Sequence, residues 1–206
     1  MSDTFAVFIG EGKRKYVLHT GIATRSSGFF RAAMEREWKE SREKQRPLAE
    51  TDEDIFEGYL QWLNTGDITF SGPPSMLTMT SFYILGDFLD DPAFRSAALD
   101  CIVARACESN KVPTSTIIRL AWEDTVRGSP IRKLYLEIWN THRLATQLLW
   151  LTHLPSDHPK EFIVELYEHC MASRELDRQI SRDERVRMIR ECRRKIAEQL
   201  SNGAGH

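Results

Sequence analysis

The feature that most constrains this fold is a change of hydrophobic period about twenty residues into the chain. Two short β-rich runs, Phe5 to Ile9 and Tyr16 to His19, flank Gly10-Glu11-Gly12 and a basic trio, which is the pattern of a β-hairpin. From Ile22 onward, apolar residues recur mainly at the spacing of amphipathic helices. The sequence therefore predicts an α+β protein that opens with a hairpin and continues mostly as helices.

The first half of the chain carries start and stop signals for several elements. Ser26-Ser27-Gly28 interrupts the helical pattern of 22–34 and predicts two short helices. Pro47-Leu48-Ala49 predicts a brief strand. Thr51 offers its hydroxyl as the N-cap of a helix that Gly66 ends. The remaining predicted elements of this half are a strand at 68–70, a helix at 75–89 and a helix that starts at Pro92.

The second half reads as entirely helical. A polar link near Pro113 precedes it, and Ser181 to Glu184 has the pattern of a capping box at the start of the last helix. We therefore divide the chain into residues 1–110 and an all-α extension, 111–206. The predicted helices of the extension are 116–126, 131–151, 160–172 and 181–200.

Composition excludes several classes of partner. The formal net charge is -2, so the chain lacks the global cationic field that favours direct binding of nucleic acid or an anionic membrane. Its longest apolar run is far shorter than a membrane span, and its first residues do not form a secretory signal. Four cysteines without a CxxC pair indicate reduced thiols. We expect an intracellular protein, cytoplasmic or nuclear.

Motifs for catalysis are missing or have a better structural explanation. Gly10-Glu11-Gly12-Lys13 lacks the spacing of a phosphate-binding loop, and the chain contains no GxSxG or HExxH motif. Ser41 to Lys44 matches SxxK only within a strongly polar run. His19 has no evident nucleophile to activate, so a structural role is favoured. We expect no enzyme, no cofactor and no small-molecule substrate.

One set of residues could in principle hold a metal ion. His153, His158, His169 and Cys170 supply imidazole and thiolate ligands of the type that zinc prefers. Their spacing matches no common zinc motif, and adjacent residues of a helix point to different sides. Histidines on a helix surface and a core cysteine are therefore the favoured interpretation.

Among the five tryptophans, Trp38 stands apart. Trp62, Trp139 and Trp150 lie in predicted helices, where a core position is the default. Trp38 lies within the charged run 36–44, where a large aromatic side chain is hard to bury locally. A contact with a protein partner is the alternative explanation for it.

With these elements in order, the sequence resembles the BTB/POZ domain, a small β-sheet flanked by a cluster of α-helices. Phe5 to Gly10 is similar to the family's opening strand, and Val17-Leu18-His19 to its "f-x-v-H" strand. Ile22 to Phe30 resembles the helix pair "l-L-a-x-R-S-x-y-F". Trp38-Lys39-Glu40-Ser41 resembles "φ-x-E-S", and Pro47 to Gly66 resembles the segment that follows.

The resemblance covers about residues 5–109. A softer one extends through Trp122 to Thr125 and Gly128 to Leu134, which look like the helical extension of stand-alone BTB proteins of filamentous fungi. That extension usually has no assigned activity, and none is carried over.

The resemblance implies a non-enzymatic protein-interaction module. In many relatives such a module presents substrates to a cullin-based ubiquitin ligase. The "φ-x-E" segment then contacts the cullin, so Trp38 would be the apolar anchor and Glu40 its charged neighbour, supported by Phe30 or Met34. The alternative is a homo- or hetero-oligomerisation scaffold in nuclear or transcriptional regulation, bound to another BTB protein or to a second copy rather than to a cullin.

Overall fold

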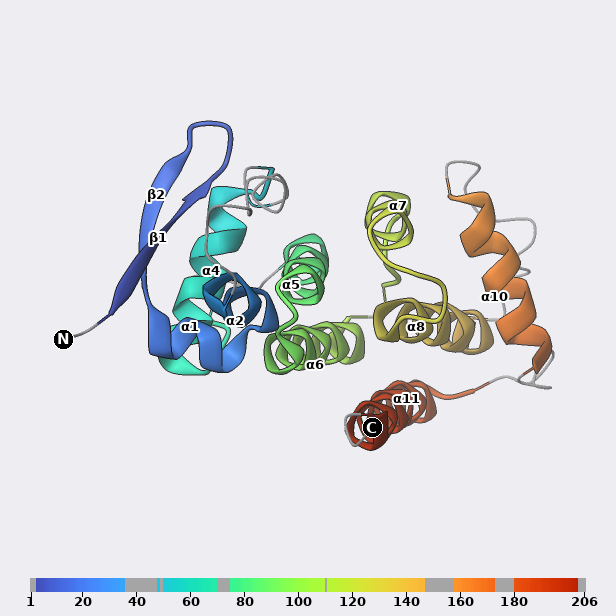
Figure 1. The fold of residues 1–206 in the computed structure, drawn as a ribbon. Coiled ribbons are helices and arrows are strands. Elements are labelled where there is room, and N and C mark those ends of the chain that lie inside the picture. The colour runs from blue at the N-terminus through green and yellow to red at the C-terminus, as the bar shows by residue number, and fades with distance from the viewer. Residues whose placement is uncertain are drawn as a thin grey trace. The chain divides into compact units, whose positions relative to one another are not determined.

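The computed structural model describes residues 3–35, 48, 50–69, 75–109, 111–146, 158–172 and 180–203. Within these ranges the chain forms one two-stranded hairpin and nine helices, an α+β architecture that is mostly helical (Figure 1). It divides into two compact units, Met1–Ala98 and Leu99–His206. The division falls inside α6 (Pro92–Glu108), which therefore contributes residues to both units.

The predicted hairpin is confirmed. Strands β1 (Thr4–Ile9) and β2 (Arg14–His19) pair antiparallel, with Val7 opposite Tyr16. Gly10 in the turn has φ 72°, a left-handed conformation that glycine adopts without steric cost. The alternation of side chains buries the face that carries Val7 and Leu18.

The helices of the first unit begin and end close to the predicted residues. α1 (Thr20–Ser26) and α2 (Gly28–Glu35) are the expected short pair. In α4 (Glu53–Thr65) the N-cap is Asp52 and not the predicted Thr51, because a carboxylate oxygen of Asp52 accepts hydrogen bonds from the backbone N–H of residues 54 and 55, at 2.8 and 3.3 Å. Gly66 ends this helix with φ 75°, as predicted.

Two predicted strands fail in the described residues. The backbone at Leu48 is helical, and its carbonyl accepts a hydrogen bond from the backbone N–H of Gly10 at 3.4 Å. Ile68 and Thr69 belong to no strand. Short apolar runs cannot by themselves distinguish a strand from other buried segments, which explains both errors.

Aromatic side chains form the core of the first unit. Phe94 at the start of α6 is fully buried, and its ring centroid lies 4.9 Å from that of Tyr59 and 5.8 Å from that of Trp62, both on α4. Phe82 of α5 (Met76–Phe88) lies 5.5 Å from the same ring. Edge-to-face and tilted ring pairs of this kind join α4, α5 and α6 around one centre.

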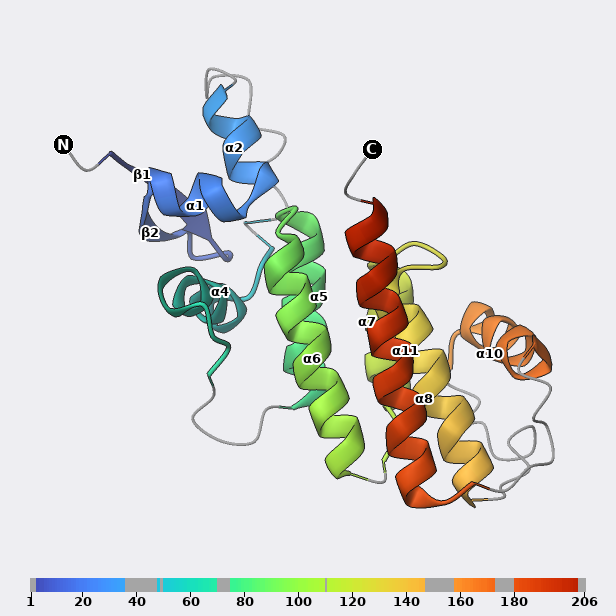
Figure 2. The ribbon, with the colours of Figure 1, turned by 90° about the horizontal axis from the view of Figure 1, so that it is seen from below.

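The second unit contains four further helices, close to the predicted ranges. α8 (Pro130–Thr146) packs against each of the other three, and Figure 2 shows α11 running alongside it. Buried residues of this unit include Leu134, Tyr135, Phe162 and Ile189. The other helices are α7 (Ser115–Glu123), α10 (Lys160–Ala172) and α11 (Arg182–Gly203).

The last helix starts as predicted, and its buried face contains charged side chains. The hydroxyl of Ser181 accepts a hydrogen bond from the N–H of Glu184 at 3.1 Å. The buried face of α11 includes two arginines. Arg193 pairs with Asp100 of α6 at 2.8 Å, and Arg185 donates to the carbonyl of Ala106, where the C-terminal end of α6 carries partial negative charge. In the described part of the chain, no helix is long and apolar enough to cross a bilayer.

Candidate functional site

The four residues expected to bind a partner fall into two groups. Phe30 is fully buried, so it supports α2 from within the core and presents no surface. Met34, one helical turn later, is 36% exposed. Trp38 and Glu40 lie outside the described residues. Helix α2 therefore starts in the core and ends with an exposed apolar side chain close to the predicted contact segment.

A short turn between α5 and α6 fixes the start of α2. The backbone N–H groups of Gly28 and Phe29 donate to the carbonyls of Asp90 and Leu89, at 3.0 and 3.1 Å. The hydroxyl of Ser27 donates to the Leu89 carbonyl at 2.6 Å. A Cβ atom at Gly28 would lie 2.0 Å from a carboxylate oxygen of Asp90, so a larger residue here would have to displace the Asp90 side chain. The sequence marks this Ser-Gly pair only as a helix break.

Asp91 ties three elements of the first unit together. It is fully buried, and its carboxylate accepts hydrogen bonds from the hydroxyls of Ser26 and Tyr59, the latter at 3.1 Å. It also accepts from the N–H of Phe94 at 2.9 Å and so caps α6. Burial, together with the charge of Asp91, raises the pKa of Tyr59 well above its ordinary value. The tyrosine is therefore a hydrogen-bond donor to Asp91 at neutral pH.

The proposed metal ligands are not brought together in the described residues. His169 and Cys170 both reach α8, where the His169 imidazole lies 2.9 Å from the Glu137 carboxylate and the Cys170 thiol donates to Asn140 at 3.3 Å. His158 is buried, not on the surface as expected, and stacks on Phe162 with ring centroids 5.3 Å apart. His153 lies outside the described residues. No three described His, Cys, Asp or Glu side chains are placed to hold a metal ion.

A cleft that the sequence did not reveal lies among α8, α10 and α11, lined by both charged and apolar side chains. Its volume is about 500 Å³. The Glu137–His169 pair lies in its wall next to Cys192, and Lys133 bonds to Gln199 at 3.2 Å. Burial, and secondarily the negative charge of Glu137, raises the pKa of Cys192 to about 12. The thiol is therefore protonated at neutral pH and is a poor nucleophile.

The raised thiol pKa predicts a loss of stability at alkaline pH. Cys192 has a pKa of about 12 in the folded chain against an ordinary value of 9.0, so the unfolded chain releases this proton first. The contribution of the protonated Cys192 thiol to the free energy of unfolding is complete below pH 9. Between pH 9 and 12 it declines, by up to about 1.4 kcal/mol per pH unit. Tyr59, whose pKa is also raised, adds to the loss above its ordinary value of 10.0.

Urea denaturation at a series of alkaline pH values measures this loss. The variant Cys192→Ala removes one of the groups whose pKa is raised, so its free energy of unfolding should fall less steeply just above pH 9. An identical pH dependence in the variant and the wild-type chain would contradict the assignment.

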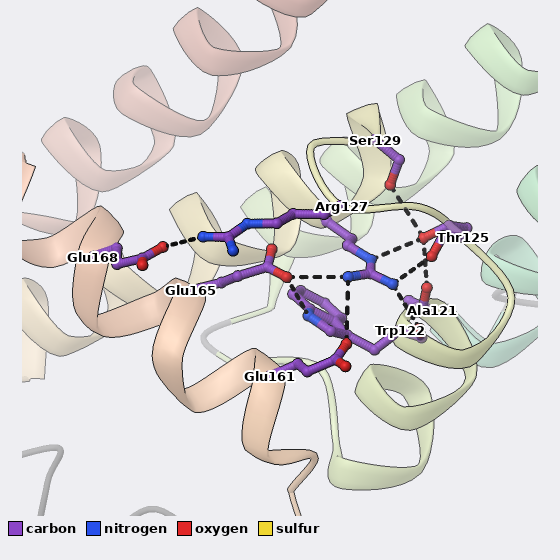
Figure 3. A network of polar contacts seen from close by, with 9 residues as sticks. Ala121, Trp122, Thr125, Arg127, Ser129, Glu161, Glu165 and Glu168 are labelled. Atoms are coloured by element: carbon purple, nitrogen blue, oxygen red, sulfur yellow. Dashed lines mark hydrogen bonds and ion pairs between the residues drawn. The ribbon is translucent and has the colours of Figure 1, made fainter.

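A second polar network in this unit has a buried centre formed by Arg132, Glu165 and Trp122 (Figure 3). Arg132 is buried and donates to the Glu165 carboxylate at 3.0 Å, while the Trp122 indole N–H donates to the same oxygen at 3.2 Å. Arg132 also donates to the hydroxyl of Thr125 at 3.1 Å and to the Trp122 carbonyl at 2.6 Å. Its guanidinium lies 5.1 Å from the centre of the Trp122 ring. These contacts fix the positions of α7, α8 and α10 relative to one another.

Comparison with known proteins adds no assignment. Family models, curated proteins and solved structures all yield no match to this chain.

Proposed function

We propose that this protein is a non-enzymatic interaction module that acts as a BTB-type adaptor for a cullin-based ubiquitin ligase. The observation that carries the proposal is the geometry of α2, whose Phe30 end is anchored in the core and whose Met34 end is exposed just before Trp38-x-Glu40. An anchored helix holds its exposed end, at Met34, at a defined place on the surface, four residues before Trp38 in the sequence. An aromatic side chain among charges is the usual composition of a binding hot spot.

The docking of the Ser27-Gly28 step supports the same proposal. These residues belong to the stretch that resembles the family's helix pair. Their hydrogen bonds to the turn at 89–91 give that stretch a physical role in placing α2. The hydrogen bonds that place α2 and the resemblance to the BTB helix pair therefore both favour the exposed end of α2 as part of the binding surface.

Truncating the proposed anchor should abolish most of the binding. We expect Trp38→Ala to weaken the affinity for a cullin N-terminal domain by about 30-fold, since loss of a desolvated aromatic anchor costs about 2 kcal/mol. Calorimetric titration of the full chain with that domain, taken from the same source, is the measurement.

Val126→Ala is the matched control because Val126 is 77% exposed and belongs to the other unit. This variant should bind the cullin domain with the affinity of the wild-type chain. No binding by a folded wild-type chain would overturn the adaptor function, and equal affinities of Trp38→Ala and wild type would overturn the assigned surface.

The scaffold function, in nuclear or transcriptional regulation, is the second candidate. Phe8 and Val17, on the outer face of the hairpin, are 53% and 61% exposed, which is unusual for large apolar side chains on one small face. A chain that associates with other copies but does not bind the cullin domain would favour this second function.

A further inference from the structure

The outer face of the hairpin is apolar and carries no acid. Side chains alternate across a strand, and the antiparallel register places Ala6 opposite Val17 and Phe8 opposite Lys15. Phe8 and Val17 are therefore diagonal neighbours on the exposed side. Lys15 and His19 both project from this face of β2. We call this surface the hairpin face; it consists of Thr4, Ala6, Phe8, Lys15, Val17 and His19.

A second exposed apolar surface lies on α10. Val164, Tyr167 and Met171 are 53%, 48% and 46% exposed. Their spacing of three and four residues places them in one stripe along the helix. Glu161 and Glu168, seven residues apart, lie on one flank of that stripe. We call these five residues the α10 face.

The two faces match in length and in the placement of charge. Three outward residues of a strand span about 13 Å, and seven residues of a helix span about 10 Å. Lys15 and His19 along β2 can meet Glu161 and Glu168 along the flank of α10. Glu161 can do so because its side chain is 77% exposed and its ion pair with Arg132 is long, at 4.0 Å.

The remaining charges near the α10 face are compatible with this pairing. Arg127 is ion-paired with Glu168 within its own chain, and the carboxylate has a second oxygen for another donor. Lys160 starts the helix one turn before Val164, and the hairpin turn offers it Glu11. Two hairpin faces brought together would instead place the Lys15 side chains of both copies in one contact that contains no acid, which disfavours pairing of like faces.

We propose that the hairpin face of one copy binds the α10 face of a second copy, which makes the protein self-associate head to tail. A contact between two different faces is heterologous, so it leaves one face of each kind open and can extend to a ring or a chain. The small size of both faces favours a weak association that depends on concentration. The proposal is independent of cullin binding, which uses the segment after α2.

Complementation between two defective copies tests this arrangement. Val17→Asp places a charge in the hairpin face, and Tyr167→Asp places one in the α10 face. The wild-type mass, followed by sedimentation velocity across a concentration series, should rise above that of a monomer. Each variant alone should stay monomeric, while an equimolar mixture of the two should form a dimer and nothing larger. The mixture assembles because each variant supplies the face that the other has lost.

Three outcomes would overturn the proposal. They are a wild-type chain that stays monomeric, a Tyr167→Asp chain that still associates, and a mixture of folded variants that does not assemble. Circular dichroism establishes that the variants are folded. A charge exchange adds a second test, since Lys15→Glu should weaken association at least tenfold and the double variant Lys15→Glu, Glu161→Lys should restore it, because each contact then pairs the exchanged charges. Cullin-domain binding by Val17→Asp separates a failure here from a failure of the adaptor function.

Discussion

Replacing Arg132 with methionine is expected to lower the free energy of unfolding by about 3 to 5 kcal/mol. The side chains of Arg132 and Glu165 are only 5% and 8% exposed, and they form a direct ion pair. The variant leaves a buried carboxylate whose remaining neutral donor, in the pairs described, is the Trp122 indole N–H. It also removes the donor to the carbonyls of Trp122 and Thr125. Urea denaturation followed by circular dichroism measures the loss.

Arg127→Met is the matched control for this prediction. Arg127 forms an ion pair with Glu168, but the two side chains are 68% and 54% exposed. Exposed pairs contribute about 0 to 1 kcal/mol, so the control should change little. The double variant Arg132→Met, Glu165→Met should recover part of the stability because no buried charge then lacks its partner. Similar losses for the Arg132 and Arg127 variants would show that burial does not set the strength of these pairs.

Asp91→Ala is expected to destabilise the chain by about 3 kcal/mol, through the loss of several buried hydrogen bonds. The substitution removes the cap of α6 and leaves the Tyr59 hydroxyl without this acceptor in the core. It also frees Ser26, so the step between α1 and α2 loses one of its attachments. The expected result is a lower urea midpoint together with weaker binding through the segment after α2.

The matched control is Asp52→Ala, which removes a cap of the same chemistry from an exposed helix end. Asp52 caps α4 through two backbone N–H groups, and within the described part of the chain it accepts no hydrogen bond from a buried hydroxyl. Its loss should cost about 1 kcal/mol, the usual value for an N-cap. If Asp91→Ala cost no more than Asp52→Ala, the hydroxyl bonds of Asp91 would contribute nothing.

Local signals predicted most of the helices and the hairpin. The hairpin follows from alternation around Gly10, and the end of α4 follows from Gly66, because left-handed backbone at these positions favours glycine. The N-cap of α4 was assigned one residue too early, since Thr51 and Asp52 both offer a capping oxygen and only the backbone path selects one. The strand at 47–49 was wrong at Leu48, where three residues carry too little periodicity to decide.

The sequence did not predict which of the candidate contact residues are buried. Phe30 and Met34 lie on the same short helix, and the resemblance to cullin-binding BTB domains made both candidates for supporting the partner surface. The structure buries the first and exposes the second, because α2 docks on the turn at Asp90 by its first residues only. Trp38 and Glu40 remain a prediction from the sequence.

By itself, the sequence determined the α+β class, the hairpin and the approximate positions of the helices, because those depend on period, caps and breakers within a few residues. Only the tertiary structure decided which polar groups meet. Arg132 and Glu165 are 33 positions apart, and Ser26 and Asp91 are 65 apart. No local pattern encodes such pairs, since they form only when packing removes water and leaves each buried charge in need of a partner.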